Sequence, residues 1–232
     1  MGIWVREEWI LISRGAEAEV YKGVFYGHPA VRKLRFPKEY RHPLLDIKIR
    51  RGRTRREARL LSMAKAARVP VPYVLYVDED ACALIIEYIE GELLRRAILK
   101  LEVEHRQEQA LKYIRLAGAY LGRLHDVGVI HGDFTTSNLI LTPSGRLFVI
   151  DFGLGYYTGS KDPEDYAVEL RVFSRGLEIY HFNYYQEYWS EFLSGYESEY
   201  GNADVVIKRV KEIFMRGRYV AERRTKWRFT LE

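Results

Sequence analysis

Two short segments of the sequence bring acidic and amide side chains close together in the chain. Asp133 follows His131-Gly132 and precedes Asn138 by five residues, and Asp151 opens the triplet Asp151-Phe152-Gly153. An aspartate can accept the proton of an attacking hydroxyl group or orient a water molecule. Aspartate and asparagine oxygens are also ligands that suit Mg²⁺. With Lys33, whose ammonium group can neutralise phosphate charge, these residue types suit the transfer of a phosphoryl group.

The order of these residues resembles the signature set of the protein kinase superfamily, and the resemblance runs from about residue 9 to about residue 180. It implies that Lys33 contacts the α- and β-phosphates of ATP, and that Glu57 holds Lys33 by an ion pair. It also implies that Asp133 receives the proton and that Asn138 and Asp151 hold Mg²⁺. The expected fold class is α+β, with a compact bilobal kinase-like arrangement: a β-rich N-lobe with one main helix and a mostly helical C-lobe.

The expected nucleotide loop departs from that signature. It is the turn Gly15-Ala16-Glu17-Ala18 between two predicted strands, with a single glycine and with an acid beside the expected phosphates. Further along the chain, Glu87 and Ile89 precede a predicted break between the lobes at Glu90-Gly91. We include both among the residues expected to bind the nucleotide.

Two other departures argue against a signalling kinase controlled by loop phosphorylation. Gly132 replaces the arginine that pairs with a phosphorylated activation loop, and no Ala-Pro-Glu follows Asp151-Phe152-Gly153. The segment 154–160 is short and runs quickly into the acidic residues 162–165. It therefore leaves little room for a platform on which a peptide substrate could dock.

Hydrophobic patterning predicts the elements that would position these residues. Strands are expected within 9–35, followed by a basic, polar connector over 36–53. The spacing Thr54-Arg55-Arg56-Glu57 matches a capping box and predicts a helix from Thr54 to about Ala67. Glu57 could therefore serve only as a cap for that helix. Two more strands are expected around 73–77 and 81–87.

After the break at Glu90-Gly91, helical periodicity dominates, apart from an apolar, turn-rich stretch over 129–155. We divide the chain into an N-lobe (1–90), a C-lobe (91–215) and a basic C-terminal tail (216–232). The aromatic residues between Tyr180 and Tyr196 are expected to pack between helices. His131 is expected to be a buried scaffold for its loop, and His125 a cation near the end of a helix.

Composition restricts the class of protein. Hydrophobic residues make up 47% of the 232 residues and charged residues 30%, which argues against global disorder. Cys82 is the only cysteine, so an intramolecular disulfide and a cysteine-rich zinc site are excluded. Acids near the start do not suit a signal peptide, and the apolar runs are too short to cross a bilayer. We expect a cytoplasmic protein without a membrane partner.

The net charge of +5 conceals two strongly basic segments. Residues 32–59 contain twelve Lys and Arg against three acids, and residues 208–228 contain nine against two. The rest of the chain is therefore acidic. Such segments are either solvated helix faces or contact sites for a polyanion, of which RNA is the expected one in the cytoplasm.

Several longer strings resemble the small atypical kinase/ATPase subunit of the KEOPS complex, which serves the threonylcarbamoyladenosine modification of tRNA. The most specific are the run from Lys38 to Pro43 and the run from Arg53 to Ala58, which also separate the sequence from RIO kinases. The resemblance extends to about Arg224. The remaining matching strings are Gly15–Ala18, Lys33–Arg35, His131–Asn138, Ile150–Leu154 and Glu164–Leu170.

This resemblance implies binding of ATP and Mg²⁺, weak phosphorylation of serine or threonine, and ATP hydrolysis within the complex. It implies that the tRNA threonylcarbamoyl transferase subunit binds the C-lobe and that a small KEOPS subunit binds the N-lobe. It also implies that the basic tail, including Arg223 and Arg224, works near the transferase and tRNA. Residues 225–232 do not match the family pattern.

Three other functions stay open at this point. A free-standing RIO-like kinase would phosphorylate a protein, and a pseudokinase would only dock partners. The intact Lys33, Asp133, Asn138 and Asp151 count against a pseudokinase. A small-molecule kinase of the aminoglycoside-kinase type shares His-Gly-Asp, but the runs from Lys38 to Pro43 and from Arg53 to Ala58 do not fit it.

Overall fold

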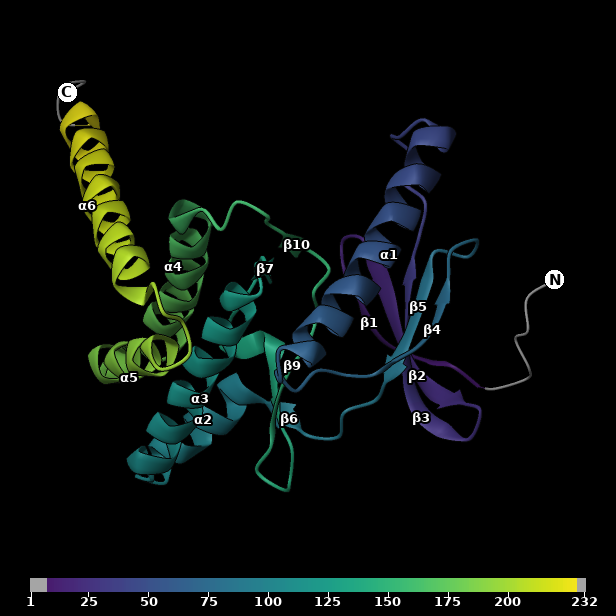
Figure 1. Ribbon diagram of the computed structural model, residues 1–232, viewed down its shortest axis with the longest axis horizontal. Coiled ribbons are helices and arrows are strands. Elements are labelled where there is room, and N and C mark those ends of the chain that lie inside the picture. Colours follow the sequence, from purple (N-terminus) through teal and green to yellow (C-terminus); the bar gives the residue numbers. More distant parts are fainter. Residues whose placement is uncertain (1–7, 229–232) are drawn as a thin grey trace. The chain divides into compact units, whose positions relative to one another are not determined.

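The computed structural model describes the backbone of residues 8–228 and the side chains of residues 8–215. The chain divides into two compact units. The first contains residues up to Ala97 together with Ser137–Tyr156, and the second contains Ile98–Thr136 and the residues from Tyr157 onwards. The predicted α+β class is confirmed, because the first unit is rich in strands and the second is mostly helical (Figure 1). The predicted lobe boundary after residue 90 stays a prediction.

A five-stranded antiparallel sheet organises the first unit (Figure 1). Its order is β1-β2-β3-β5-β4. The turn Tyr26-Gly27 between β2 and β3 has positive φ at both residues, 48° and 81°, as a tight hairpin turn of type I′ requires. The strands are β1 (Ile10–Arg14), β2 (Ala18–Phe25), β3 (His28–Arg35), β4 (Val74–Asp78) and β5 (Ala83–Glu87).

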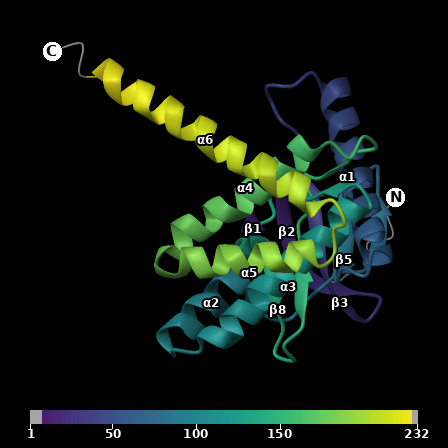
Figure 2. The same ribbon diagram turned by 60° about the vertical axis from the view of Figure 1, so that its left-hand side comes forward.

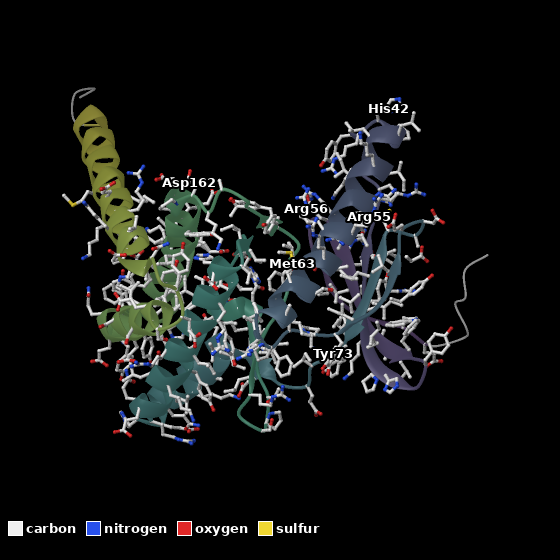
Figure 3. The ribbon with its side chains drawn as sticks, viewed as in Figure 1. His42, Arg55, Arg56, Met63, Tyr73 and Asp162 are labelled. Atoms are coloured by element: carbon white, nitrogen blue, oxygen red, sulfur yellow. The ribbon has the colours of Figure 1, made fainter. Side chains whose placement is uncertain are left out.

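Helix α1 (Pro43–Ala66) is much longer than predicted, and the expected connector over 36–53 is wrong for most of its length. The helix begins with Pro43 in its first turn, a position that proline suits because no intrahelical hydrogen bond is lost there. Thr54 is not its N-cap but lies in its interior, where the hydroxyl donates to the carbonyl oxygen of Arg50 at 3.0 Å. Figure 3 labels His42 just before the helix and Met63 near its end.

The missed start of α1 has a physical reason. The buried side of the helix includes Asp46, Thr54 and Glu57 beside Leu60 and Leu61. Since hydrophobic periodicity reveals a helix only when its buried side is apolar, the polar half of α1 gives no such signal.

Short elements complete the first unit. A three-stranded sheet has the order β6-β8-β9 and is antiparallel. The amide of Val149 in β9 donates to the carbonyl oxygen of Pro70 at 2.9 Å, and so ties this small sheet to the chain that follows α1. The elements are β6 (Glu92–Leu93), β8 (Leu139–Leu141), β9 (Leu147–Val149), the start of α2 (Leu94–Val103) and the end of the 3₁₀-helix η1 (Thr136–Asn138).

The second unit is a group of helices around an aromatic core. Helix α5 packs along α3, and the start of α6 packs on α4 (Figure 2). The rings of Phe173 and Phe192 stack at 3.8 Å between centroids, so the prediction that aromatic residues pack between helices is confirmed. Tyr180 and Phe182 are exceptions, with 41% and 78% of their surfaces exposed. The elements are α3 (Gln107–Asp126), β7 (Val129–Ile130), β10 (Tyr156–Tyr157), α4 (Pro163–Tyr180), η2 (Phe182–Tyr184), α5 (Tyr185–Glu197) and α6 (Ala203–Arg228). Within the described part of the chain, no helix has the length and apolar character to cross a membrane.

Glycines allow α3 and α5 to approach each other closely. A Cβ atom on Gly118 of α3 would collide with the carbonyl oxygen of Phe192, and one on Gly195 of α5 would collide with that of Arg115. Both obstacles are backbone atoms of the facing helix, so relief requires the two helices to separate.

We expect Gly195→Ala to lower the free energy of unfolding by about 1–3 kcal/mol, the usual cost of overpacking a core. Gly52→Ala on α1 is the matched control, because a Cβ atom there meets nothing within 4 Å. Alanine favours a helix interior over glycine by about 0.5–1 kcal/mol, so this control should be neutral or stabilising. Thermal unfolding measures both changes, and equal effects of the two substitutions would contradict the close helix approach.

Candidate active site

A cavity of about 250 Å³ in the first unit contains several of the residues expected to bind a nucleotide. It is formed by the turn between β1 and β2, by one side of β3, and by the segment that begins with Asp151. Its lining residues are Ser13, Gly15, Ala16, Glu17, Ala18, Val20, Lys33, Arg35, Asp151, Gly153 and Leu154.

Two cations hold the turn over residues 15–18 in place. Within the turn, the amide of Gly15 donates to the carbonyl oxygen of Ala18 at 2.9 Å. From outside it, the ammonium group of Lys38 donates to the carbonyl oxygen of Ala16, and Arg53 of α1 forms an ion pair with Glu17. The acid that sequence analysis placed beside the phosphates is therefore paired with a cation.

Lys33 joins the two acidic residues of the site. Its Nζ atom lies 2.9 Å from Oε1 of Glu57 and 2.5 Å from Oδ1 of Asp151. Burial alone would lower the pKa of Lys33, but attraction to Glu57 and Asp151 outweighs burial and the pKa is raised. Lys33 therefore carries a full positive charge at the wall of the cavity.

Glu57 is a buried acid with two cationic partners. Its Oε1 atom binds Lys33, and its Oε2 atom accepts from the guanidinium of Arg35. Only 2% of its side chain is exposed. Since Glu57 lies in the middle of α1, the alternative that it only caps a helix is wrong.

Asp151 presents its carboxylate to the cavity. About half of its side chain is exposed (51%), in contrast to the buried Glu57. Its backbone has a φ of 62°, and its Oδ1 atom accepts from the amide of Gly153 at 3.1 Å. A Cβ atom on Gly153 would lie 2.9 Å from that oxygen and 3.0 Å from Nζ of Lys33. Only glycine at position 153 leaves the Lys33–Asp151 contact undisturbed.

The other predicted residues of the first unit lie elsewhere. Asn138 ends η1, and its carbonyl oxygen accepts from the amide of Ile150 at 3.0 Å, which ties it to the residue before Asp151. Glu87 ends β5, where its side chain accepts from the amide of Tyr73 at 3.1 Å. Ile89 is buried. Among the residues that the structure describes, the cavity lining includes none of Asn138, Glu87 and Ile89, and their predicted roles stay predictions.

Asp133 lies in the second unit, on a loop that a buried glutamate organises. The Glu169 carboxylate of α4 accepts hydrogen bonds from the amides of His131 at 3.1 Å and Gly132 at 2.6 Å. The amide of Asp133 donates to Nδ1 of the buried His131 at 3.3 Å, so the predicted scaffold role of His131 is confirmed. The φ of 85° at Gly132 favours glycine, while the side chain of Asp133 is exposed.

His125 is not the helix-end cation that the sequence suggested. It is fully buried, its ring stacks on Tyr166 at 4.1 Å, and Nε2 lies 2.9 Å from Oε2 of Glu169. Burial lowers the pKa of His125, and attraction to Glu169 offsets this only in part. The ring is therefore neutral near pH 7, donating to Glu169 and accepting from the hydroxyl of Tyr196, which lies 2.9 Å from Nδ1.

Three residues that organise the predicted site residues of their own units were missed from the sequence. Arg35 lies two residues after Lys33 on the same strand, and the alternation of a β-strand places both on one face. This alternation could have predicted that Arg35 lies beside Lys33. Arg53 lay in the supposed connector, and Glu169 lies in mid-helix, 37 residues from the amide of Gly132 that it binds. Both lie within strings that match the family, but the types of the neighbouring residues give neither Arg53 nor Glu169 a role in the site.

The donor set of the cavity fits Mg²⁺ bound together with phosphates. Among the residues that the structure describes, no group of three or more His, Cys, Asp or Glu could hold a metal ion. Mg²⁺ usually binds through one or two carboxylates together with substrate phosphates and water. The exposed carboxylate of Asp151 is therefore adequate when phosphates supply the rest, while the other acid of the lining, Glu17, is paired with Arg53. The charged Lys33 in the same wall suits those phosphates.

Most cations of the first basic segment, residues 32–59, form ion pairs within the first unit. At least seven of the twelve cations in residues 32–59 form ion pairs with acids of that unit. Arg55, labelled in Figure 3, pairs with Glu79 at 3.0 Å, and Arg51 pairs with Asp80 at 2.6 Å. Arg223 and Arg224 of the second segment lie within the backbone of α6, but their side chains are outside the described part.

Comparison with known proteins decides the family. The model of the protein kinase domain family matches residues 11–175. The chain is 39% identical over 217 residues to the KEOPS complex subunit Bud32 of Pyrococcus abyssi, covering 90% of this chain and 96% of that protein. The chain belongs to the protein kinase domain family and, within it, to the Bud32 family. It is also 38% identical to the EKC/KEOPS complex subunit bud32 of Dictyostelium discoideum, over 90% of this chain and 82% of that protein.

A third relative of this Bud32-family chain is a longer protein. The probable bifunctional tRNA threonylcarbamoyladenosine biosynthesis protein of Methanothermobacter thermautotrophicus is 40% identical over 90% of this chain, which spans only 36% of that protein. The predicted family is thus confirmed, and a family of aminoglycoside-kinase type is not supported.

The lowered pKa of His125 predicts a pH dependence of stability. Below the ordinary histidine pKa of about 6.5, the unfolded chain binds a proton at this residue while the folded chain resists it. The free energy of unfolding should therefore fall as the pH drops from 7.5 to 5.5. Urea unfolding at both pH values measures the fall, which should be smaller in His125→Gln. His28→Gln, at an exposed position of β3, should keep the wild-type fall; equal falls in all three proteins would contradict the prediction.

Proposed function

We propose that the protein binds ATP with Mg²⁺ and acts as an ATPase and weak serine/threonine kinase in the KEOPS complex, in the threonylcarbamoyladenosine modification of tRNA. The observation that carries the chemical part is the charged Lys33, which is only partly exposed and is held between Glu57 and Asp151 in the wall of a cavity beside the 15–18 turn. This is a site for a polyanion and a hard divalent cation.

Each residue has a task in this proposal. Lys33 binds the α- and β-phosphates, and Glu57 orients Lys33. The turn Gly15-Ala16-Glu17-Ala18 covers the phosphates, while Glu87 and Ile89 bind the nucleotide from the side of β5. Asp151 and Asn138 hold Mg²⁺, which neutralises charge on the phosphates when bound.

Asp133, which lies in the second unit, acts on the hydroxyl group or water molecule that attacks the phosphate. Its exposed carboxylate receives a proton from a serine or threonine hydroxyl, or orients a water molecule for hydrolysis. Glu169 and His131 keep the backbone of its loop in one conformation. The buried, neutral His125 supports Glu169 without competing for the proton.

The relatives support the assembly part of the proposal. Two of them are named as subunits of the KEOPS complex, and one is named as bifunctional in tRNA threonylcarbamoyladenosine biosynthesis. A region like this chain is therefore joined covalently to further sequence in one relative, which supports direct contact with a second protein of the same pathway. We propose that the partners are the transferase subunit on the C-lobe and a small KEOPS subunit on the N-lobe, in the cytoplasm.

The basic end of α6 is the proposed contact for tRNA. Most cations of the first basic segment, residues 32–59, form ion pairs with acids of the same unit. We therefore do not include this segment in the proposed tRNA contact. Residues 208–228 hold nine Lys and Arg against two acids, and Arg223 and Arg224 are adjacent near the end of the helix. Several such contacts to phosphates give affinity that is sensitive to salt and largely independent of sequence.

A labelled-ATP assay tests the chemical part. The full chain is incubated with Mg²⁺ alone, then with tRNA and the transferase subunit, and products are resolved as free phosphate or phosphoprotein. We expect free phosphate to rise with tRNA and partner and to fall by at least about 100-fold in Asp151→Ala, because the electrostatic terms that Asp151 supports dominate phosphoryl transfer. Asp133→Asn should also suppress turnover while nucleotide affinity is retained.

The control is Asp80→Asn, which changes an exposed carboxylate of the same unit, paired with Arg51 outside the cavity. It should leave turnover unchanged. Phosphoprotein that ignores both tRNA and partner would favour a free-standing kinase. Turnover that survives Asp151→Ala would refute the assigned site, and tight partner binding without any turnover would favour a docking subunit.

Neutralising the tail tests the tRNA contact. Arg223→Gln combined with Arg224→Gln should weaken tRNA binding by the assembled complex and reduce its salt dependence, because counterion release falls with each lost phosphate contact. The affinity of the isolated chain for ATP should stay the same. The matched control is Arg51→Gln with Arg55→Gln, whose partners are Asp80 and Glu79. Unchanged tRNA binding in the tail variant would refute the contact. Equal losses of tRNA affinity in both variants would show that net charge, not the tail, is responsible.

A further inference from the structure

The structure points to a third residue that governs Lys33. We propose that Arg35 is a positioning residue, which holds the carboxylate of Glu57 so that Lys33 is correctly placed for the phosphates. The inference rests on the proposed ATP chemistry of the same cavity. Neither the family comparison nor the kinase signature assigns a role to this arginine.

The contacts of Arg35 show how it would act. The guanidinium binds Oε2 of Glu57, leaving Oε1 for Lys33, and Nη1 lies 3.4 Å from Oγ1 of Thr54. One arginine on β3 therefore reaches two residues that are one turn apart on α1. Only 3% of Arg35 is exposed, although it forms part of the cavity wall.

The backbone of Arg35 is held as firmly as its side chain. Its amide donates to the carbonyl oxygen of Cys82 at 3.1 Å, and its own carbonyl oxygen accepts from Nη1 of Arg50 at 3.2 Å. Arg50 is itself bound to the buried Asp46 through Nε at 2.6 Å. A continuous chain of polar contacts thus joins the first half of α1 to the end of β3.

Charge balance explains why a second cation is needed. Lys33 binds both Glu57 and Asp151. If Lys33 turned toward the phosphates, its ion pair with Glu57 would weaken. A buried carboxylate without compensation is strongly destabilising. Arg35 keeps Glu57 paired throughout, and α1 therefore stays against β3 when Lys33 moves.

In this arrangement, Arg35 rather than a phosphorylated activation loop would hold α1 in position. In protein kinases the Lys–Glu pair depends on the position of the helix, which activation-loop phosphorylation sets. Here Gly132 removes the arginine that would read such a phosphate, and the segment after Gly153 is short. Arg35 supplies the restraint from within the strand, so the helix needs no phosphorylation to hold Glu57 in place.

The test compares variants of the full chain in ATP hydrolysis with Mg²⁺. Arg35→Gln should lower kcat/KM by about 10- to 100-fold, the loss expected when a reacting group is misplaced by about an ångström. Arg35→Lys should restore part of it, since the charge returns without the fork that reaches both Glu57 and Thr54. Arg51→Gln, which breaks an exposed ion pair on α1, should keep the wild-type kcat/KM.

A double-variant cycle separates positioning from simple loss of stability. If Arg35 acts through Glu57, then Arg35→Gln adds little to the loss caused by Glu57→Gln, whereas independent effects multiply. Melting temperatures are measured in parallel. If Arg35→Gln does not fold, Arg35→Lys decides: a reduced kcat/KM at an unchanged melting temperature supports the role, and a wild-type kcat/KM overturns it.

The two proposals fail in different ways. An Arg35→Gln protein with wild-type kcat/KM, beside an inactive Asp151→Ala protein, overturns the role of Arg35 and leaves the ATP site standing. Losses that multiply in the double variant also overturn it. Turnover that Asp151→Ala leaves intact overturns the proposed function itself, together with the inference that depends on it.

Discussion

The first unit depends on one buried carboxylate. Glu57 is almost fully withdrawn from solvent, and two cations of a single strand bind its two oxygens. Burying a charge is costly unless it is paired and hydrogen-bonded, so the position of α1 against β3 is determined by this contact as much as by apolar packing. The polar side of α1 continues the same principle through Asp46 and Arg50. The buried side of the helix is thus polar from Asp46 to Glu57 and apolar from Ala58 to Ala64.

The second unit also has a buried glutamate, but with different partners. Glu169 accepts from two backbone amides and from a histidine that burial keeps neutral. Within the described part of the chain, these donors are neutral N–H groups, so dipoles stabilise the negative charge of Glu169. A carboxylate with three well-directed donors organises a loop without adding a competing positive charge beside Asp133. Each unit thus contains a buried acid linked to a predicted catalytic or metal-binding aspartate of the same unit: Glu57 through Lys33 to Asp151, and Glu169 through the loop backbone to Asp133.

The sequence predicted the parts of the site whose signals are local. Lys33, Glu57 and Asp151 stand in a recognisable order, and the structure brings Lys33 within hydrogen-bonding distance of both acids. The start of α1 was missed because its buried side carries Asp46 and Thr54, which give no hydrophobic period. Glu169 was missed because its partners are distant in the chain and its neighbours in the helix are ordinary. The alternation of a β-strand could have revealed Arg35, which lies two residues after Lys33, but the sequence analysis assigned no role to Arg35.

The inward turn of the loop amides toward Glu169 limits what the loop can recognise. Because the amides of His131 and Gly132 are committed to that carboxylate, they are not available as donors to an incoming molecule. Near the exposed Asp133, the loop therefore offers the aspartate side chain but not these two amides. Under the proposed function, a phosphoryl acceptor at Asp133 would be recognised by groups other than these amides, so selectivity between acceptors would depend on surfaces outside this part of the loop.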